Sequence, residues 1–357
     1  MRTPRGRFGP GGVRTGRGLP APTSTLSTSV LSTSVPPADA PPTGDAVVDL
    51  PGMPGLGGLY AAGVLGSARA AVGGLVASVG ASGRATLTVG PDDLPGTRLR
   101  LGGIRPDADH LTAYQHLLCE PAGDVLPAGF LHVTAFPVAM ALMVRHDFPL
   151  PLLGMVHVAN RIEQRRPVRL GEPLAVTMSA RDLREHRAGV TVDLVAEITV
   201  DDAVVWQGVS TYLSKGVRLA GGAGGAPSDA GRPVFEPPTP TGRWRLPADV
   251  GRRYATVSGD RNPIHLSPLA ARAFGFPRTI AHGMYTAARA LADVGSARGE
   301  SFVWEVEFAK PVLLPSTVTV RVAEDDARGG YDVTGWDARR GRLHLSGRVT
   351  PTGRLTR

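Results

Sequence analysis

The chain has one cysteine, few aromatic residues and no long apolar segment. Cys119 is the single thiol among 357 residues, and aromatic side chains make up 5% of the composition. One thiol excludes an intramolecular disulfide and fits a reducing cytoplasm, which is the location we expect. The small-residue stretch 64–83 is rich in Gly and interrupted by Arg69, so it does not predict a membrane span.

Metal-binding and nucleic-acid-binding patterns are also missing. The nine histidines neither cluster with cysteine nor show His-x-x-x-His spacing, so no metal site is predicted. The formal net charge is +8, but the basic residues are scattered and no nucleic-acid-binding motif accompanies them. The glycines of 55–58 follow no predicted strand, which argues against a dinucleotide-binding loop.

Two segments have the composition of tails or linkers. Residues 1–45 are rich in Ser, Thr and Pro and hold too little apolar surface to fold alone, so we expect a disordered tail. Their Arg-rich, acid-poor start is also similar to an organelle targeting segment. Residues 216–241, with Gly221–Gly225 and Pro237-Pro238, predict a linker. The expected domains are therefore 46–215 and 242–351.

The most informative stretch is Tyr254–His265, which holds a carboxylate, an amide and an imidazole. Asp260, Asn262 and His265 fall within six residues and follow Gly259. Gly, Asx side chains and the residue before Pro all favour bent, non-helical backbone. Asp and His on such a loop would both reach one water and move its proton. An Asx-turn beside a solvated histidine is the alternative.

A helix is predicted directly downstream. Met284, Ala287, Ala288 and Leu291 recur at the spacing of an apolar helical face, which places Gly283 at or near the helix N-terminus. Unpaired backbone N–H groups at such a terminus suit a developing oxyanion on a carbonyl. A glycine kept for close packing is the alternative.

These residues together resemble a known family. The stretch 254–265 resembles the signature of the MaoC-like (R)-specific enoyl-thioester hydratases, also called hydratase 2 enzymes. A second family element resembles His282-Gly283-Met284. The resemblance is close over 250–294 and loose from there to 350. The positions that resemble the family signature are Tyr254, Val257, Ser258, Gly259, Asp260, Asn262, Pro263, Ile264, His265 and Ala271.

The resemblance implies an α+β hot-dog fold, an antiparallel sheet wrapped around a long helix. It also implies reversible hydration of trans-2-enoyl thioesters to (R)-3-hydroxyacyl thioesters, with no metal and no redox cofactor. Asp260 and His265 would bind and activate the water, and Asn262 would orient the water or the loop. The Gly283 amide would polarise the thioester carbonyl. The implied substrate-binding residues are Asn262, Gly283, His282 and Met284.

An internal echo predicts two related hot-dog halves. Arg166–Val176 parallels Lys310–Val320, and Pro127–His132 parallels Pro277–His282, in the same order. Convergent patterning is the alternative. Strands are expected in both halves because β-branched residues are enriched in these ranges: Val190–Val200, Val204–Leu213, Thr317–Val322 and Leu343–Val349.

The two halves differ at the site. Where the second half has Asp260–His265, the first reads His110–Cys119, so we expect the first half to be degenerate. Its apolar helical stretch Ala135–Val144 would either widen a tunnel for an acyl chain or fill a core with Phe136, Met140 and Met143.

The sequence thus predicts a double hot-dog hydro-lyase whose catalytic half is 242–351, a pseudo-dimer in one chain that would also form a homodimer. The expected partner is an acyl-CoA or acyl-carrier-protein thioester, because the basic excess suits CoA phosphates or an acidic carrier. A hot-dog thioesterase, which would attack the carbonyl carbon, is the competing enzyme. A non-catalytic acyl-binding or assembly subunit is the alternative from another class.

Overall fold

The computed structural model describes residues 46–60, 63, 87–152, 154–222 and 234–353. The expected tail 1–45, the stretch 64–83 and much of the expected linker lie outside the described residues. All described residues belong to one compact unit. Within the described ranges, no helix is long and apolar enough to cross a membrane.

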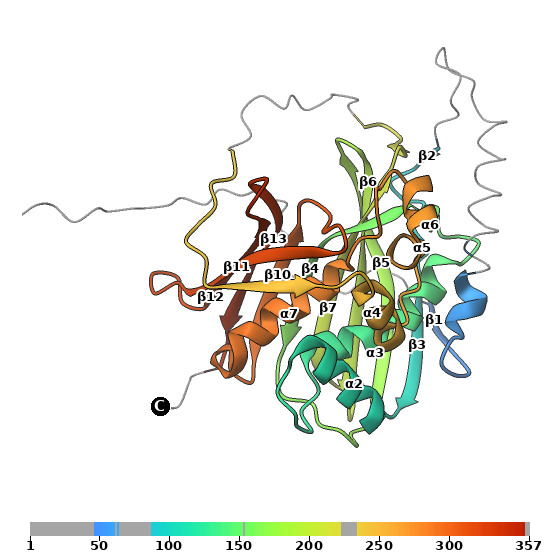
Figure 1. The fold of residues 1–357 in the computed structure, drawn as a ribbon. Coiled ribbons are helices and arrows are strands. Elements are labelled where there is room, and N and C mark those ends of the chain that lie inside the picture. Colours follow the sequence, from blue (N-terminus) through green and yellow to red (C-terminus); the bar gives the residue numbers. More distant parts are fainter. Residues whose placement is uncertain (1–45, 61–62, 64–86, 153, 223–233, 354–357) are drawn as a thin grey trace, which may run out of the picture. The chain divides into compact units, whose positions relative to one another are not determined.

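A long mixed sheet forms the frame, and in the described part of the chain it has eleven strands in the order β1-β3-β5-β6-β7-β4-β10-β13-β12-β11-β9 (Figure 1). The first half contributes β1 (Ala46–Asp49), β3 (Thr97–Ile104), β4 (Met155–Gln164), β5 (Leu174–His186), β6 (Gly189–Val200) and β7 (Ala203–Lys215). The second half contributes β9 (Gly242–Leu246), β10 (Phe302–Phe308), β11 (Ser316–Glu324), β12 (Tyr331–Asp337) and β13 (Arg342–Pro351). A separate small sheet pairs β2 (Thr88–Val89) with β8 (Arg218–Leu219).

Each half places helices before an antiparallel meander. The first half has α2 (Ala108–Leu118) and α3 (Ala128–Met143). The second has α4 (Val250–Ser258), α5 (Pro263–Leu266), α6 (Pro268–Ala273), α7 (Gly283–Val294) and the short 3-10 helix η1 (Gly295–Arg298). The four predicted strand segments lie in β6, β7, β11 and β13, so that prediction is confirmed.

The two halves join along one pair of strands. β4 and β10 are antiparallel neighbours, with Phe302 opposite Gln164 and Glu307 opposite Ala159. Across this seam each short helix contacts the long helix of the other half: α2 packs on α7, and α4 packs on α3. The site carried by α4 and the loop after it therefore lies against the first half.

Hydrogen bonds reveal the true register of the internal repeat. Leu126 N donates to Val168 O at 2.7 Å, and Ala281 N donates to Val312 O at 2.9 Å. Arg166–Val176 and Lys310–Val320 are thus equivalent, as the sequence echo predicts. Because Leu126 corresponds to Ala281, the residue equivalent to His282 is Pro127. The predicted match of Pro127–His132 with Pro277–His282 is therefore wrong by five residues, and His132 lies one turn inside α3.

The prediction that His110–Cys119 corresponds to the second half's catalytic loop is also wrong. This segment is mostly α2, the counterpart of α4, and both helices end at a left-handed residue, Cys119 with φ 57° and Gly259 with φ 71°. From that residue, the first half reaches its long helix through 120–127, whereas the second half needs 260–282 and forms α5 and α6 on the way. The loop that carries Asp260 and His265 is a segment that the first half lacks.

The long helices are buried for different reasons. α3 is apolar on nearly every face, since it packs against the sheet and also against α4 of the second half. Met140 and Met143 are 2% and 4% exposed within the core, which favours core filling over a tunnel wall. α7 begins at Gly283 as predicted, and its predicted apolar face is buried.

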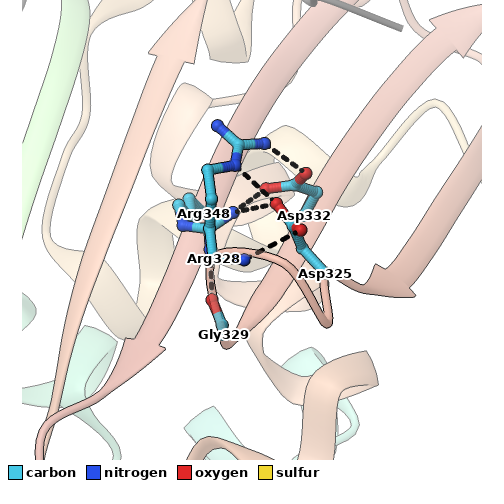
Figure 2. A network of polar contacts seen from close by, with 5 residues as sticks. All are labelled: Asp325, Arg328, Gly329, Asp332 and Arg348. Atoms are coloured by element: carbon cyan, nitrogen blue, oxygen red, sulfur yellow. Dashed lines mark hydrogen bonds and ion pairs between the residues drawn. The ribbon is translucent and has the colours of Figure 1, made fainter. Parts of the chain in front are cut away.

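Polar contacts hold the turn between β11 and β12 (Figure 2). Arg328 Nε donates to Asp325 at 2.6 Å, and Arg348 Nη1 contacts Asp332 at 2.6 Å and Asp325 at 3.0 Å. Arg348 also donates to the Gly329 carbonyl. Single exposed ion pairs contribute little stability, but this linked set fixes the turn from several sides.

Candidate active site

Local chemistry shapes the loop that carries the predicted site. Gly259 ends α4 in the left-handed region, which favours glycine, and Pro263 begins α5. The Asn262 side chain accepts a hydrogen bond from Ile264 N at 3.3 Å and so caps α5. Of the two roles that the resemblance leaves open for Asn262, this contact favours orientation of the loop.

The two carboxylate oxygens of Asp260 have different surroundings. Oδ1 accepts hydrogen bonds from Tyr60 Oη at 2.8 Å and from Asn262 N at 3.1 Å. Oδ2 lies 3.8 Å from His282 Nε2. Burial raises the pKa of Asp260, but His282, His265 and the two hydrogen bonds outweigh it and lower the pKa below its usual value. Asp260 is therefore ionised at neutral pH, with Oδ2 the oxygen left for a ligand.

His265 has one ring nitrogen, Nε2, that is available to accept a hydrogen bond. Its Nδ1 lies 2.8 Å from the carbonyl oxygen of Ile280. Because a carbonyl only accepts, Nδ1 carries the proton and Nε2 carries a lone pair. Burial lowers the pKa of His265, against the opposing effect of Asp260, so the ring is neutral at pH 7. Nε2 is then a second hydrogen-bond acceptor near Asp260.

His282 lies directly against His265. The two rings stack with centroids 3.6 Å apart and planes 24° from parallel. His282 Nε2 donates to the backbone oxygen of Asp260 at 2.9 Å, while its buried Nδ1 has no hydrogen-bond partner. Burial lowers the pKa of His282 to about 3. A neutral His282 thus connects the start of α7 to the loop that carries Asp260.

Gly283 and Met284 lie where α7 begins. A Cβ on Gly283 would stand 3.0 Å from the ring of Phe308, so close packing, the alternative considered from sequence, is observed. It leaves the backbone amide of this helix N-terminus as a candidate donor. Met284 is buried, and Asn160 Nδ2 of the first half donates to its sulfur at 3.5 Å. Met284 therefore also stabilises the seam between the halves.

Asp260, His265 and His282 are the group that would hold a metal ion, since their ligand atoms lie within 4.8 Å of one another. One feature of the geometry disfavours that use. The two rings stack close to parallel and so do not converge on a point, as tetrahedral coordination requires. The arrangement suits a small neutral molecule that donates hydrogen bonds, such as water.

Sequence reasoning missed a wall of ring side chains on the first half's side of the site. His157 stacks on Tyr212 with ring centroids 4.6 Å apart, lies 5.4 Å from Phe308 and lies 6.0 Å from His132. Burial lowers the pKa of His132 to about 4 and that of His157 to about 3, although both side chains keep some exposed surface. His132, His157, Tyr212 and Phe308 thus form one cluster of rings, to which the second half contributes Phe308.

The equivalent position in the first half carries an ion pair instead of a site. Glu120 follows the left-handed Cys119, as Asp260 follows Gly259. Its side chain is 2% exposed and lies 3.0 Å from Arg298 Nη2, which comes from the second half. Burial raises the pKa of Glu120, against the opposing effect of Arg298. The first half thus has a carboxylate at this position but no imidazole loop beside it, so its degeneracy stays a prediction.

Comparisons with known proteins agree with this architecture. The MaoC like domain matches residues 230–336. The chain is 38% identical to 3-hydroxyacyl-thioester dehydratase X of Mycobacterium tuberculosis, over 72% of this chain and 90% of that protein. It is 28% identical to 3-hydroxyacyl-thioester dehydratase Y of the same organism, over 72% of this chain and 85% of that protein.

Solved structures extend the comparison. The crystal structure of HtdX of Mycobacterium tuberculosis aligns with a TM-score of 0.63 at 35% identity, covering 71% of this chain and 99% of that one. A MaoC-like dehydratase from Phytophthora capsici shares the fold, with a TM-score of 0.57 at 18% identity over 72% of this chain and 95% of that one. The fold and site thus define a double hot-dog protein. More narrowly, the chain belongs to the MaoC-like dehydratase family.

Proposed function

We propose that this chain reversibly hydrates trans-2-enoyl thioesters to (R)-3-hydroxyacyl thioesters in fatty-acid or related acyl metabolism. One observation carries the proposal: Asp260 and His265 each place an acceptor atom within 4.8 Å of the other and of His282, which caps the N-terminus of α7. The printed names of the relatives, which describe dehydratases of hydroxyacyl thioesters, support the same reaction. The stereochemistry rests on the resemblance to hydratase 2 enzymes.

The reaction follows from the charges of these groups. An ionised Asp260 and a neutral His265 together accept both hydrogens of one water, which turns a lone pair of its oxygen outward. That oxygen attacks C3, a C–O bond forms, and the broken O–H bond leaves its proton on one of the two acceptors. The Gly283 amide stabilises the negative charge on the thioester oxygen. The proton then passes to C2, which restores the acceptor.

The proposed substrate is an acyl-CoA or acyl-carrier-protein thioester. Five exposed arginines lie on and around α4, α5 and α6, and in the described part of the chain none of them forms an ion pair. Unpaired arginines bind phosphate oxygens and acidic surfaces. They are Arg252, Arg253, Arg261, Arg272 and Arg278. We also propose a cytoplasmic location, which suits the exposed free thiol of Cys119.

An absorbance assay with crotonyl-, octenoyl- and dodecenoyl-CoA tests the function. Loss of the enone signal without free thiol identifies hydration, whereas release of thiol identifies the thioesterase alternative. Asp260→Asn and His265→Gln should each lower turnover by about 10² to 10⁴, the usual contribution of acid–base catalysis. The exposed pair Asp326→Asn and His146→Gln are matched controls that should keep full activity. A folded Asp260→Asn variant with near-normal hydration would exclude the proposed mechanism.

We also propose the domain division 46–215, 216–241 and 242–351. The end of β7 at Lys215 and the start of β9 at Gly242 support it. The hot-dog architecture supplies the pseudo-dimer within one chain, with the catalytic loop in the second half and α3 of the first half packed on α4.

A further inference from the structure

An N-terminal segment of the first half reaches the catalytic loop of the second. β1 adds to the sheet edge parallel to β3, with Ala46 opposite Thr97 and Asp49 opposite Arg100. The chain then forms a helical turn over 56–60. The Leu56 side chain occupies the space that a Cβ on Gly259 would need. This contact, with the left-handed backbone of Gly259, anchors the segment on the loop that carries Asp260.

Tyr60, at the end of that turn, makes two hydrogen bonds to the loop. Its hydroxyl lies 2.8 Å from Asp260 Oδ1, and Arg261 N donates to the hydroxyl oxygen at 2.9 Å. Since the Arg261 amide is a donor, the hydroxyl proton is free to go to the carboxylate. Burial, followed by the charge of Asp260, raises the pKa of Tyr60 well above its usual value, so the proton stays on the oxygen at neutral pH.

These contacts decide which oxygen of Asp260 is available. Tyr60 and Asn262 N both bind Oδ1, which leaves Oδ2 on the side of His282. A hydrogen bond donated to the ionised carboxylate also lowers its pKa. Without the hydroxyl, the carboxylate would lose one of the two contacts that fix its rotation and would hold a proton more readily.

We propose that Tyr60 is a positioning residue, delivered by the N-terminal segment of the first half, that fixes Asp260 with Oδ2 toward the reacting water. The inference rests on the proposed function of Asp260. It means that the degenerate half still contributes to the active site, through a residue that makes no contact with the reacting atoms.

Kinetics of the full chain with Tyr60→Phe test this inference. Loss of one hydrogen bond to a charged group should lower kcat on crotonyl-CoA about 10- to 100-fold with little change in KM. The acid limb of kcat/KM should move to higher pH, because Asp260 loses a donor that lowers its pKa. Tyr331→Phe, on a partly exposed tyrosine of β12, is the matched control and should change neither quantity.

Other results with Tyr60→Phe would contradict the positioning role. A Tyr60→Phe enzyme that gains activity would show that Tyr60 blocks the site, and an unchanged acid limb would show that it does not act through Asp260. Leu56→Ala, which loosens the segment but keeps the hydroxyl, should lower kcat in the same direction and less strongly. If the unaltered chain hydrates no enoyl thioester, the proposed function fails. If it does and Tyr60→Phe matches it, only the role of Tyr60 fails.

Discussion

Mild acid should destabilise this fold strongly, because three desolvated imidazoles, one buried and two partly buried, are held neutral. Burial lowers the pKa of His132 to about 4 and the pKa of His157 and of His282 to about 3. In the unfolded chain the pKa of a histidine is about 6.5. Below that pH the unfolded chain binds protons that the folded chain does not, so stability falls as the pH drops toward the folded-state pKa values.

The size of the effect follows from these values. At about pH 5, an imidazole with a folded pKa of 3 to 4 costs roughly 2 kcal/mol relative to neutral pH. The three histidines together would cost roughly 6 kcal/mol, a large share of the roughly 5–15 kcal/mol that stabilises a typical domain. All of this loss is absent above about pH 7.5, where the imidazoles are neutral in both states.

Urea unfolding at about pH 7.5 and about pH 5, followed by tryptophan fluorescence, measures the loss. All four tryptophans are at most 4% exposed and lie in both halves: Trp206, Trp244, Trp304 and Trp336. His157→Gln should reduce the pH-dependent loss by roughly 2 kcal/mol, whatever its effect at neutral pH. The exposed control His116→Gln should leave it unchanged. A total loss below about 1 kcal/mol, or an unchanged loss in His157→Gln, would refute the reasoning.

Three further predictions concern catalysis and assembly. Activity needs an ionised Asp260 and a neutral His265, and both pKa values are lowered, so kcat/KM should stay level from about pH 8 to about pH 6.5; a limb centred at or above about 6.5 would contradict this. Gly283→Ala should destabilise the chain by about 1–3 kcal/mol through contact with Phe308, as unfolding would show, and Phe308→Leu in the same chain should restore stability. The fragment Gly242–Arg357 should aggregate, because the edge of β10 that pairs with β4 would be exposed; a monomeric, active fragment on size exclusion would contradict this.

The predictable part of the site is the part that is local in sequence. Gly259, Asp260, Asn262 and His265 build one turn whose geometry depends on their own backbone preferences, and the start of α7 follows from apolar spacing. The register of the internal repeat is not predictable from this spacing, because His132 lies at the same distance from a proline as His282 but inside a helix instead of before one. Spacing to a proline does not fix where a helix begins.

The remaining parts depend on contacts between distant segments. Tyr60 lies in a turn whose sequence suggests no function, and only the pairing of β1 with β3 brings it to a loop some two hundred residues away. His132 and His157 occupy regular positions on α3 and β4, where a single histidine has no distinguishing pattern. The two histidines come together through packing within the first half, and Phe308 reaches His157 across the seam.

The ion pair between Glu120 and Arg298 shows what covalent fusion permits. In a symmetric homodimer every substitution appears twice, so a change that closes one active site closes both. Within a single chain the two copies of the ancestral surface evolve independently. One copy is therefore free to lack a loop and pair its carboxylate with an arginine, while its helix and N-terminal segment pack against the loop and helix of the other. Covalent fusion thus permits the two halves to differ in sequence at equivalent positions.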